Sequence, residues 1–76
     1  MKIQLNNYSP AEIIKLLRSL SNLTQDEFAS SLNKSRNYIN NLENNRTKIT
    51  LDVFLEILNL YNYQIFINKN NEKSNT

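Results

Sequence analysis

The stretch TQDEFASSLNKSRNYINNLE, residues 24–43, decides the fold of this chain. Its first half begins with TQDEFASS, residues 24–31. Thr24 with Glu27 three residues later is a capping-box pattern, which marks the start of a helix. The apolar residues that follow recur at helical spacing and give the helix one apolar face. They are Phe28, Ala29 and Leu32. The first half of the stretch therefore predicts a short amphipathic helix.

The second half predicts another short helix after a tight turn. Asn33-Lys34 interrupts the apolar pattern, and Ser35 can cap a helix whose inner face is Ile39 and Leu42. Side chains with paired donors and acceptors occupy its outer face, and these match base edges in the major groove of DNA. The outward positions are Arg36, Asn37, Asn40 and Asn41, with Tyr38 at the margin. The stretch is a candidate recognition unit.

This pattern resembles the Cro/phage-repressor type of helix-turn-helix, also called the XRE family. The resemblance covers roughly residues 11–61. It is carried by Leu23-Thr24-Gln25, by Ala29 at the close contact between the helices, by Ser35-Arg36-Asn37-Tyr38-Ile39 and by Leu42-Glu43-Asn44. It implies a mainly α fold: a compact bundle of four helices with a lambda-repressor-like helix-turn-helix.

Size and composition limit the alternatives. A chain of 76 residues predicts one small domain. The absence of cysteine and histidine excludes disulfides, ordinary zinc sites and His-dependent catalysis. We therefore expect no enzyme, metal, cofactor or small-molecule ligand. No apolar run is long enough to span a membrane, and no signal peptide is evident, which predicts a cytoplasmic protein.

The helix-turn-helix domain is expected to occupy residues 9–61. Ser9-Pro10-Ala11-Glu12 is a strong helix start, and the helix should run to about Leu20. Its expected buried stripe is Ile13, Leu16, Leu17 and Leu20. Residues 1–8 form either an edge strand or an irregular arm. The chain has no glycine, so Asn33 and Asn45 are expected at the turn positions where the family usually has glycine.

The C-terminal part predicts a dimerisation surface. Thr50 caps a helix from Leu51 to about Tyr61 that is apolar nearly all round, and a helix of this kind is normally buried on more than one face. Residues 62–68 contain a β-branched and aromatic run that predicts a strand, paired either with residues 2–5 or with its own copy in a second subunit. Residues 69–76 are expected to be a disordered tail. The expected dimer interface is Val53, Ile57, Leu60, Tyr63, Ile65, Phe66 and Ile67.

The resemblance also implies roles for individual residues. The second helix of the motif would place Ser35, Arg36, Asn37 and Asn41 against base edges. Phosphate contacts would come from Gln25, Lys34, Tyr38, Asn40, Asn44, Asn45, Arg46 and Lys48. Four of the residues from 34 to 48 are basic and only Glu43 is acidic, which fits this surface. An acid there would repel phosphate, and in relatives it pairs with an arginine of the first helix; here that pair would be Arg18 and Glu43.

Two functions remain open on the sequence alone. One is a sequence-specific DNA-binding transcriptional regulator, a homodimeric repressor that inserts the helix at 35–44 into the major groove of a two-fold operator. The alternative is the antitoxin of a toxin–antitoxin pair, or a small phage-encoded regulator. That protein would bind another protein through the helix at 51–61 and the strand at 63–67. Both readings include double-stranded DNA as a partner.

Overall fold

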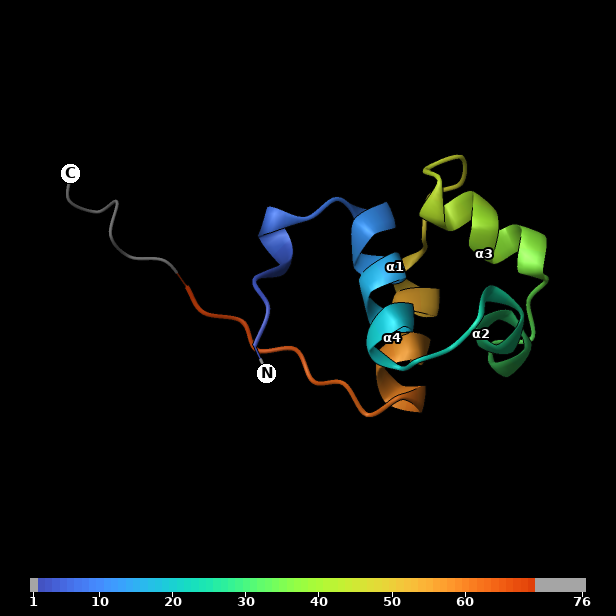
Figure 1. The fold of residues 1–76 in the computed structure, drawn as a ribbon. Helices are drawn as coiled ribbons and strands as arrows, with labels where there is room; N and C mark the ends of the chain where they lie inside the picture. The colour runs from blue at the N-terminus through green and yellow to red at the C-terminus, as the bar shows by residue number, and fades with distance from the viewer. Residues whose placement is uncertain (1, 70–76) are drawn as a thin grey trace.

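The four α-helices within the described residues form one bundle, shown in Figure 1. The computed structural model describes residues 2–69. A 3-10 turn at Leu5–Asn7 is followed by the helices, which are α1 (Pro10–Leu20), α2 (Gln25–Ser31), α3 (Arg36–Glu43) and α4 (Leu51–Leu60). Helices α2 and α3 pack against each other at one end of the bundle, and α3 also packs against α1. The expected fold of four helices with a helix-turn-helix is confirmed.

Capping side chains start every one of these helices where the sequence predicted. Ser9 and Glu12 form a full capping box at α1, and Thr24 and Glu27 form another at α2. Ser35 Oγ accepts the backbone N–H of Tyr38, and Thr50 caps α4 in the same way through Val53. Each such cap stabilises its helix by about 1 kcal/mol, because it satisfies N–H groups that have no partner within the helix.

Asparagine ends the helices of this glycine-free chain. Asn33 has φ 57° and Asn45 has φ 61°, which confirms that they occupy left-handed turn positions. Asn22 and Asn62 adopt the same conformation after α1 and α4, which the sequence reading did not anticipate. Asparagine is suited to this region because its short polar side chain can hydrogen-bond locally.

The core lies where all four helices meet. Its largest fully buried side chains are Phe28, Ile14, Ile39 and Ile57, one from each helix. Phe28 also contacts Tyr61, with ring centroids 5.7 Å apart. On α1 the expected stripe was wrong in part: Ile14 and Leu17 are buried, Ile13 and Leu16 are half-buried, and Leu20 is exposed. Helix α1 packs against α3, and this contact covers only part of its broad run of apolar residues.

Helix α4 turns a different face to the core from the one expected. Val53 and Ile57 were expected to be left over for a partner, but they are buried within the chain's own core. The exposed apolar residues of α4 are Leu51, Leu55 and Leu60. The expected exposure of Val53 and Ile57 was wrong because apolar residues surround nearly the whole helix, so the sequence pattern does not show which side faces inward.

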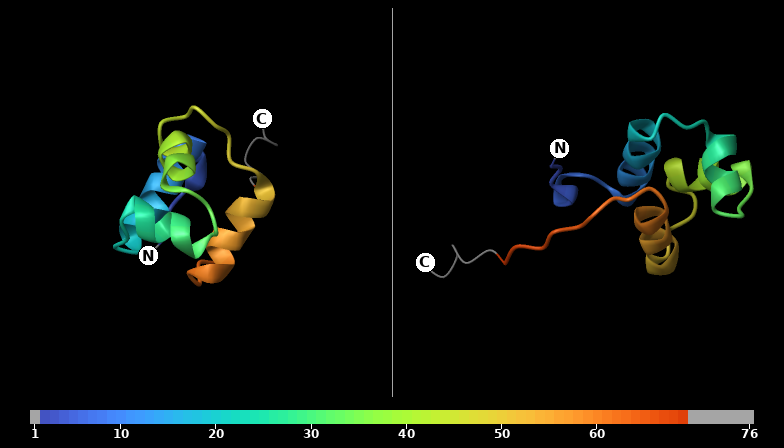
Figure 2. Two further views of the ribbon diagram at one scale, coloured as in Figure 1. Left: turned by 90° about the vertical axis from the view of Figure 1, so that its right-hand side faces the viewer. Right: turned by 90° about the horizontal axis from the view of Figure 1, so that it is seen from below.

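No strand is present within residues 2–69. The segment after Asn62 is irregular and runs away from the helices, as Figure 1 and the right-hand view of Figure 2 show. Tyr63 fixes its start, because the Tyr63 hydroxyl lies 2.8 Å from Ser21 Oγ and donates to Leu17 O at 3.3 Å. The expected strand at 62–68 is wrong for the single chain, which provides no neighbouring strand for its backbone groups. Of the two alternatives for the N-terminal segment, residues 2–8 adopt the irregular arm, with the 3-10 turn at Leu5–Asn7. The predicted tail lies outside the described residues from residue 70 onward.

Candidate nucleic-acid interface

Helix α3 has one face fixed in the core and the other exposed. Ile39, Leu42 and Glu43 are buried, whereas Arg36 and Asn37 on the first turn are exposed. At the start of the helix, Ser35 Oγ accepts a backbone N–H at 3.1 Å, so its hydroxyl hydrogen remains able to donate to a ligand. The buried side therefore holds the helix rigidly while its opposite side presents polar groups.

An ion pair between α1 and α3 supports this face from within. Arg18 Nε donates to Glu43 Oε2 at 2.6 Å, and Arg18 Nη2 donates to Glu43 Oε1 at 3.0 Å. Arg18 Nη1 also donates to the backbone O of Leu23, which precedes α2. The guanidinium thus connects α1, the α1–α2 turn and α3. This is the pair that the resemblance implied.

Burial of Glu43 works to raise the pKa of its carboxyl group, but hydrogen bonds from Arg18 and Gln25 outweigh that effect and hold the pKa below its usual value. The carboxylate in turn raises the pKa of Arg18. Both groups are therefore charged at neutral pH. The negative charge of Glu43 is neutralised inside the protein by Arg18.

Three amide side chains at the edge of α3 form a chain of hydrogen bonds. Gln25 Nε2 donates to Glu43 Oε1 at 3.1 Å and makes a longer bond to Asn40 Oδ1 at 3.4 Å. Asn44 Nδ2 donates to the backbone O of Asn40 at 2.8 Å and to Asn40 Oδ1 at 3.0 Å. Gln25 and Asn40 are half-buried as a result. Gln25, expected to face phosphate, is connected to the buried ion pair through its bond to Glu43.

The loop after α3 is attached to the helix through Asn41. The backbone N–H of Arg46 donates to the backbone O of Asn41 at 2.8 Å, and Arg46 Nη1 lies 3.4 Å from Asn41 Oδ1. Asn45 makes the turn between them with its left-handed backbone. Arg46 and Asn41, expected to contact phosphate and base respectively, are thereby brought side by side.

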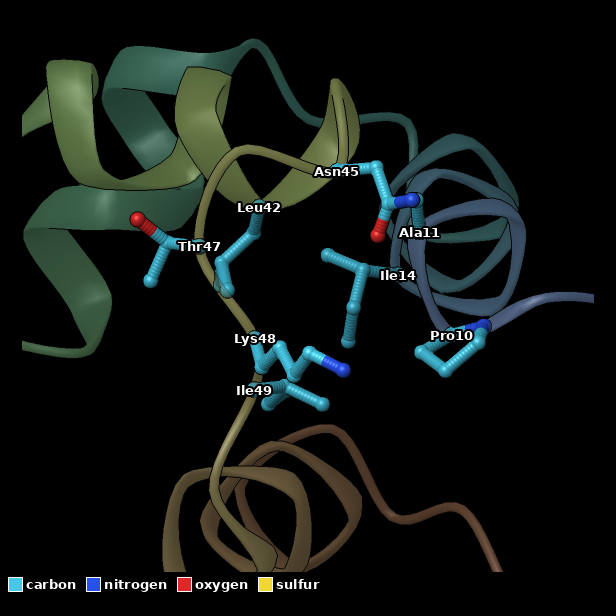
Figure 3. A pocket seen from close by; sticks show the side chains of 8 residues that line it. All are labelled: Pro10, Ala11, Ile14, Leu42, Asn45, Thr47, Lys48 and Ile49. Carbon is cyan, nitrogen blue, oxygen red and sulfur yellow. The ribbon is translucent and has the colours of Figure 1, made fainter.

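The two lysines of the candidate surface lie at its opposite margins. Lys34 Nζ lies 5.2 Å from the centre of the Tyr38 ring, a cation–π contact that places both at the start of α3. Lys48 instead borders a pocket of about 320 Å³ between α1, the end of α3 and the following loop, and Figure 3 shows its side chain directed toward α1. A phosphate contact by Lys48 requires its flexible stem to turn outward.

The amide chain is the part of the site that sequence reasoning missed. The spacing of Asn40 and Asn44 by one helical turn is visible in the sequence and permits their contact. Nothing in the sequence places Gln25 beside them, because that contact depends on the angle between α2 and α3. The remaining predicted residues lie along α3 and its two flanking turns, with Arg36, Asn37 and Arg46 exposed.

An exposed polar helix fixed by a partner helix through a tight turn defines the helix-turn-helix class of DNA-binding domains. The sequence profile of the helix-turn-helix family HTH_3 matches residues 14–67, and the chain belongs to this family. The resemblance to XRE-type regulators is thus confirmed. None of the curated protein sequences compared with the chain matches it.

Solved structures of similar proteins agree with this assignment. The chain is 32% identical to a chain described as "MDT Protein", with a TM-score of 0.61, covering 91% of this chain and 96% of that one. A chain from a HipA-HipB-O2-O3 complex gives the same identity, TM-score and coverage. A chain from a HipB-O1-O2 complex has the same identity and TM-score, with 91% of this chain and 99% of that chain covered. The protein is a helix-turn-helix DNA-binding protein similar to HipB.

The described part of the chain offers little support for other classes of site. No helix within residues 2–69 is long and apolar enough to cross a membrane. The same residues hold no group of three acidic, histidine or cysteine side chains that could bind a metal ion.

Proposed function

We propose that this protein is a sequence-specific transcriptional regulator that acts as a homodimeric repressor on a two-fold DNA site. The observation that carries the proposal is the exposed face of α3, whose first turn presents Arg36 and Asn37 while Ile39 and Leu42 hold the helix in the core. In helix-turn-helix proteins the N-terminal residues of the second motif helix contact base edges in the major groove.

The base contacts in this proposal come from the exposed side of α3. Arg36 is suited to guanine O6 and N7, and Asn37 to adenine N6 and N7. Ser35 contributes its hydroxyl hydrogen, and Asn41 contributes an amide whose oxygen already faces Arg46. A well-formed bidentate contact discriminates against the wrong base by about 1–3 kcal/mol.

Phosphate contacts in this proposal flank the helix on both sides. Lys34 and Tyr38 lie at its start, and Asn45, Arg46 and Lys48 follow its end. Their charges and amides give affinity and register without reading sequence. Because these contacts release counterions from DNA, binding should weaken steeply as salt rises.

A dimer would present two copies of α3 to neighbouring turns of the major groove. Its proposed interface is the segment that follows α4, where Ile65, Phe66 and Ile67 are exposed in the single chain. Pairing with the same segment of a second copy would give their backbone groups the partners that one chain lacks. Leu60 lies exposed beside it, whereas Val53 and Ile57 support the interface only from within the core. Half-sites are then expected roughly 34 Å apart.

Selection of bound sites from a random duplex library tests the proposal, with the wild-type protein and Arg36→Ala compared. The wild type should return a motif with two-fold symmetry. Arg36→Ala should lose preference at one base position in each half-site, by roughly 5- to 150-fold. Lys69→Ala, which removes an equal charge outside the helix-turn-helix, should keep the motif. Recovery of random sequence by the wild type would reject sequence-specific regulation.

A second function has its own support in the exposed apolar residues Leu51 and Leu55 of α4. A solved complex contains a HipB chain similar to this one together with HipA. If the protein is an antitoxin, α4 and residues 63–67 would bind a toxin encoded by a neighbouring gene. To test this, the purified product of the neighbouring gene is mixed with the wild type and with Leu55→Lys, and each mixture is analysed by size-exclusion chromatography. A defined complex that forms with the wild type and is lost in Leu55→Lys supports the antitoxin function. Separate elution of the wild type and the neighbouring protein rejects it.

A further inference from the structure

The half-buried side chain of Gln25 has a fixed orientation in this structure. Both oxygens of Glu43 are hydrogen-bond acceptors only, because the carboxylate is ionised beside Arg18. The Gln25 group that faces Glu43 Oε1 at 3.1 Å must therefore be its NH₂. The second hydrogen of this NH₂ points to Asn40 Oδ1. Gln25 consequently has no amide hydrogen left for another acceptor.

The same reasoning fixes the orientations of Asn44 and Asn40. The backbone O of Asn40 only accepts, so the Asn44 group 2.8 Å from it is the NH₂. Its other hydrogen is given to Asn40 Oδ1 at 3.0 Å. Asn40 Oδ1 thus receives donors from Gln25 and Asn44, and Asn40 Nδ2 makes no hydrogen bond to any of residues 2–69.

A phosphate oxygen accepts hydrogen bonds and cannot donate them. Gln25 and Asn44 have committed both of their amide hydrogens inside the protein, so neither can bind phosphate unless this network breaks. Asn40 is the one amide of the three whose two hydrogens remain available. Its contact with Gln25 places it on the side of α3 that faces the start of α2, and in helix-turn-helix proteins the first motif helix crosses the DNA backbone.

We propose that Gln25 is a positioning residue whose side chain contacts no DNA, and that Asn40, oriented by Gln25 together with Asn44, donates to a backbone phosphate. This proposal rests on the proposed DNA-binding function. Through Gln25, the buried Arg18–Glu43 pair determines which end of the Asn40 amide faces the DNA. Without Gln25, only the bond from Asn44 Nδ2 still holds the Asn40 oxygen inward, so the amide flips more readily and presents its oxygen, which phosphate repels.

A double-mutant cycle tests the proposal with four proteins: wild type, Gln25→Met, Asn40→Ala and the double variant. Methionine keeps the length of the side chain and removes its hydrogen bonds. Binding constants are measured on a selected DNA site at one salt concentration and well below every melting temperature. Asn40→Ala should weaken binding about tenfold. Gln25→Met should weaken it by less, because Asn44 still holds the Asn40 amide, and the double variant should be no weaker than Asn40→Ala alone. Asn59→Ala, an exposed asparagine of α4, should leave binding unchanged.

Three results would overturn the proposal. If the two losses multiply in the double variant, the Gln25 side chain contacts DNA independently of Asn40. If Asn40→Ala binds as tightly as wild type, Asn40 makes no contact. If Asn40→Ala changes base preference at one position instead of weakening all sequences equally, its acceptor is a base and not a phosphate.

The cycle also separates this inference from the proposed function. Phosphate contacts act on any duplex, so the same four proteins can be compared on a nonspecific duplex at low salt. A wild type that selects no site but shows the coupled losses would reject sequence-specific regulation and retain the role of Gln25. A wild type that selects a site and shows independent losses would reject only the role of Gln25.

Discussion

Arg18 and Glu43, 25 residues apart in sequence, form a two-pronged ion pair between α1 and α3. The Glu43 side chain is only 2% exposed and that of Arg18 is 19% exposed. Because Arg18 also donates to the backbone O of Leu23, one guanidinium fixes α3 relative to both α1 and the turn that leads into α2. The position of the proposed recognition helix therefore depends on a contact on the side away from its exposed face.

Removing the arginine should destabilise the fold strongly. Arg18→Met leaves the Glu43 carboxylate buried without its main partner, and we expect a loss of roughly 2–3 kcal/mol. Glu43→Gln should cost less, because a neutral amide oxygen can still accept from Arg18. Urea unfolding of the two variants measures the difference. Equal stability of Arg18→Met and the wild type would show that the pair contributes nothing to the fold.

The same pair predicts a loss of stability in acid. Since the pKa of Glu43 is lowered in the folded state, its contribution is fully present above its ordinary value of 4.5 and is lost as the pH falls through the lower folded-state value. For the wild type, the free energy of unfolding should decrease as the pH is lowered from 7 to 2. Glu43→Gln, which cannot titrate there, should show a shallower decline; parallel curves would contradict the assignment.

Ala29 is the small buried residue of α2 in the core. Its side chain is 2% exposed, and a larger residue must push α2 away from its neighbours. Ala29→Leu should cost about 1–3 kcal/mol through overpacking. Ser30→Leu adds the same side chain at the next, exposed position and serves as the control. If Ala29→Leu and Ser30→Leu have the same melting temperature, Ala29 is not in a tightly packed contact.

The left-handed turn at Asn33 should tolerate glycine better than alanine. Asn33 has φ 57°, and the backbone N–H of the following Lys34 donates to Ala29 O at 2.9 Å, closing the end of α2. Asn33→Ala should lose about 1 kcal/mol, because a Cβ disfavours this conformation. Asn33→Gly should stay within about 0.5 kcal/mol of wild type. Chemical denaturation of both proteins checks the order, and an alanine variant as stable as the glycine variant would refute it.

The segment after α4 should control self-association and not the stability of the protomer. Phe66 is 77% exposed, so Phe66→Glu removes little from the core. Analytical ultracentrifugation should find the wild type dimeric and Phe66→Glu monomeric. At concentrations low enough for the wild type to dissociate, the two proteins should have nearly equal melting temperatures, because dimerisation then no longer stabilises the wild type. Leu51→Glu, on the exposed face of α4, should leave the dimer intact. If Leu51→Glu dissociates the dimer instead, the interface lies on α4.

Local features of this fold were predictable because they depend on neighbours in sequence. The capping boxes at Ser9 and Thr24 act over three residues, and the sequence places them correctly. The left-handed asparagines at 33 and 45 follow from a chain that turns without glycine. The buried Phe28 and Ile39 follow from helical spacing alone. The inward face of α4 did not follow, because apolar residues surround most of that helix.

By itself, the sequence determined the four helix starts, the turn between α2 and α3, and the polar character of α3, since each depends on residues within one or two helical turns. Only the tertiary structure decided that Val53 and Ile57 belong to the core, that residues 63–69 form no strand in a single chain, and that Gln25 reaches Glu43 and Asn40. These outcomes depend on the angles between helices and on which backbone groups find partners. The angles between helices and the partners of backbone groups are set only when the whole core packs.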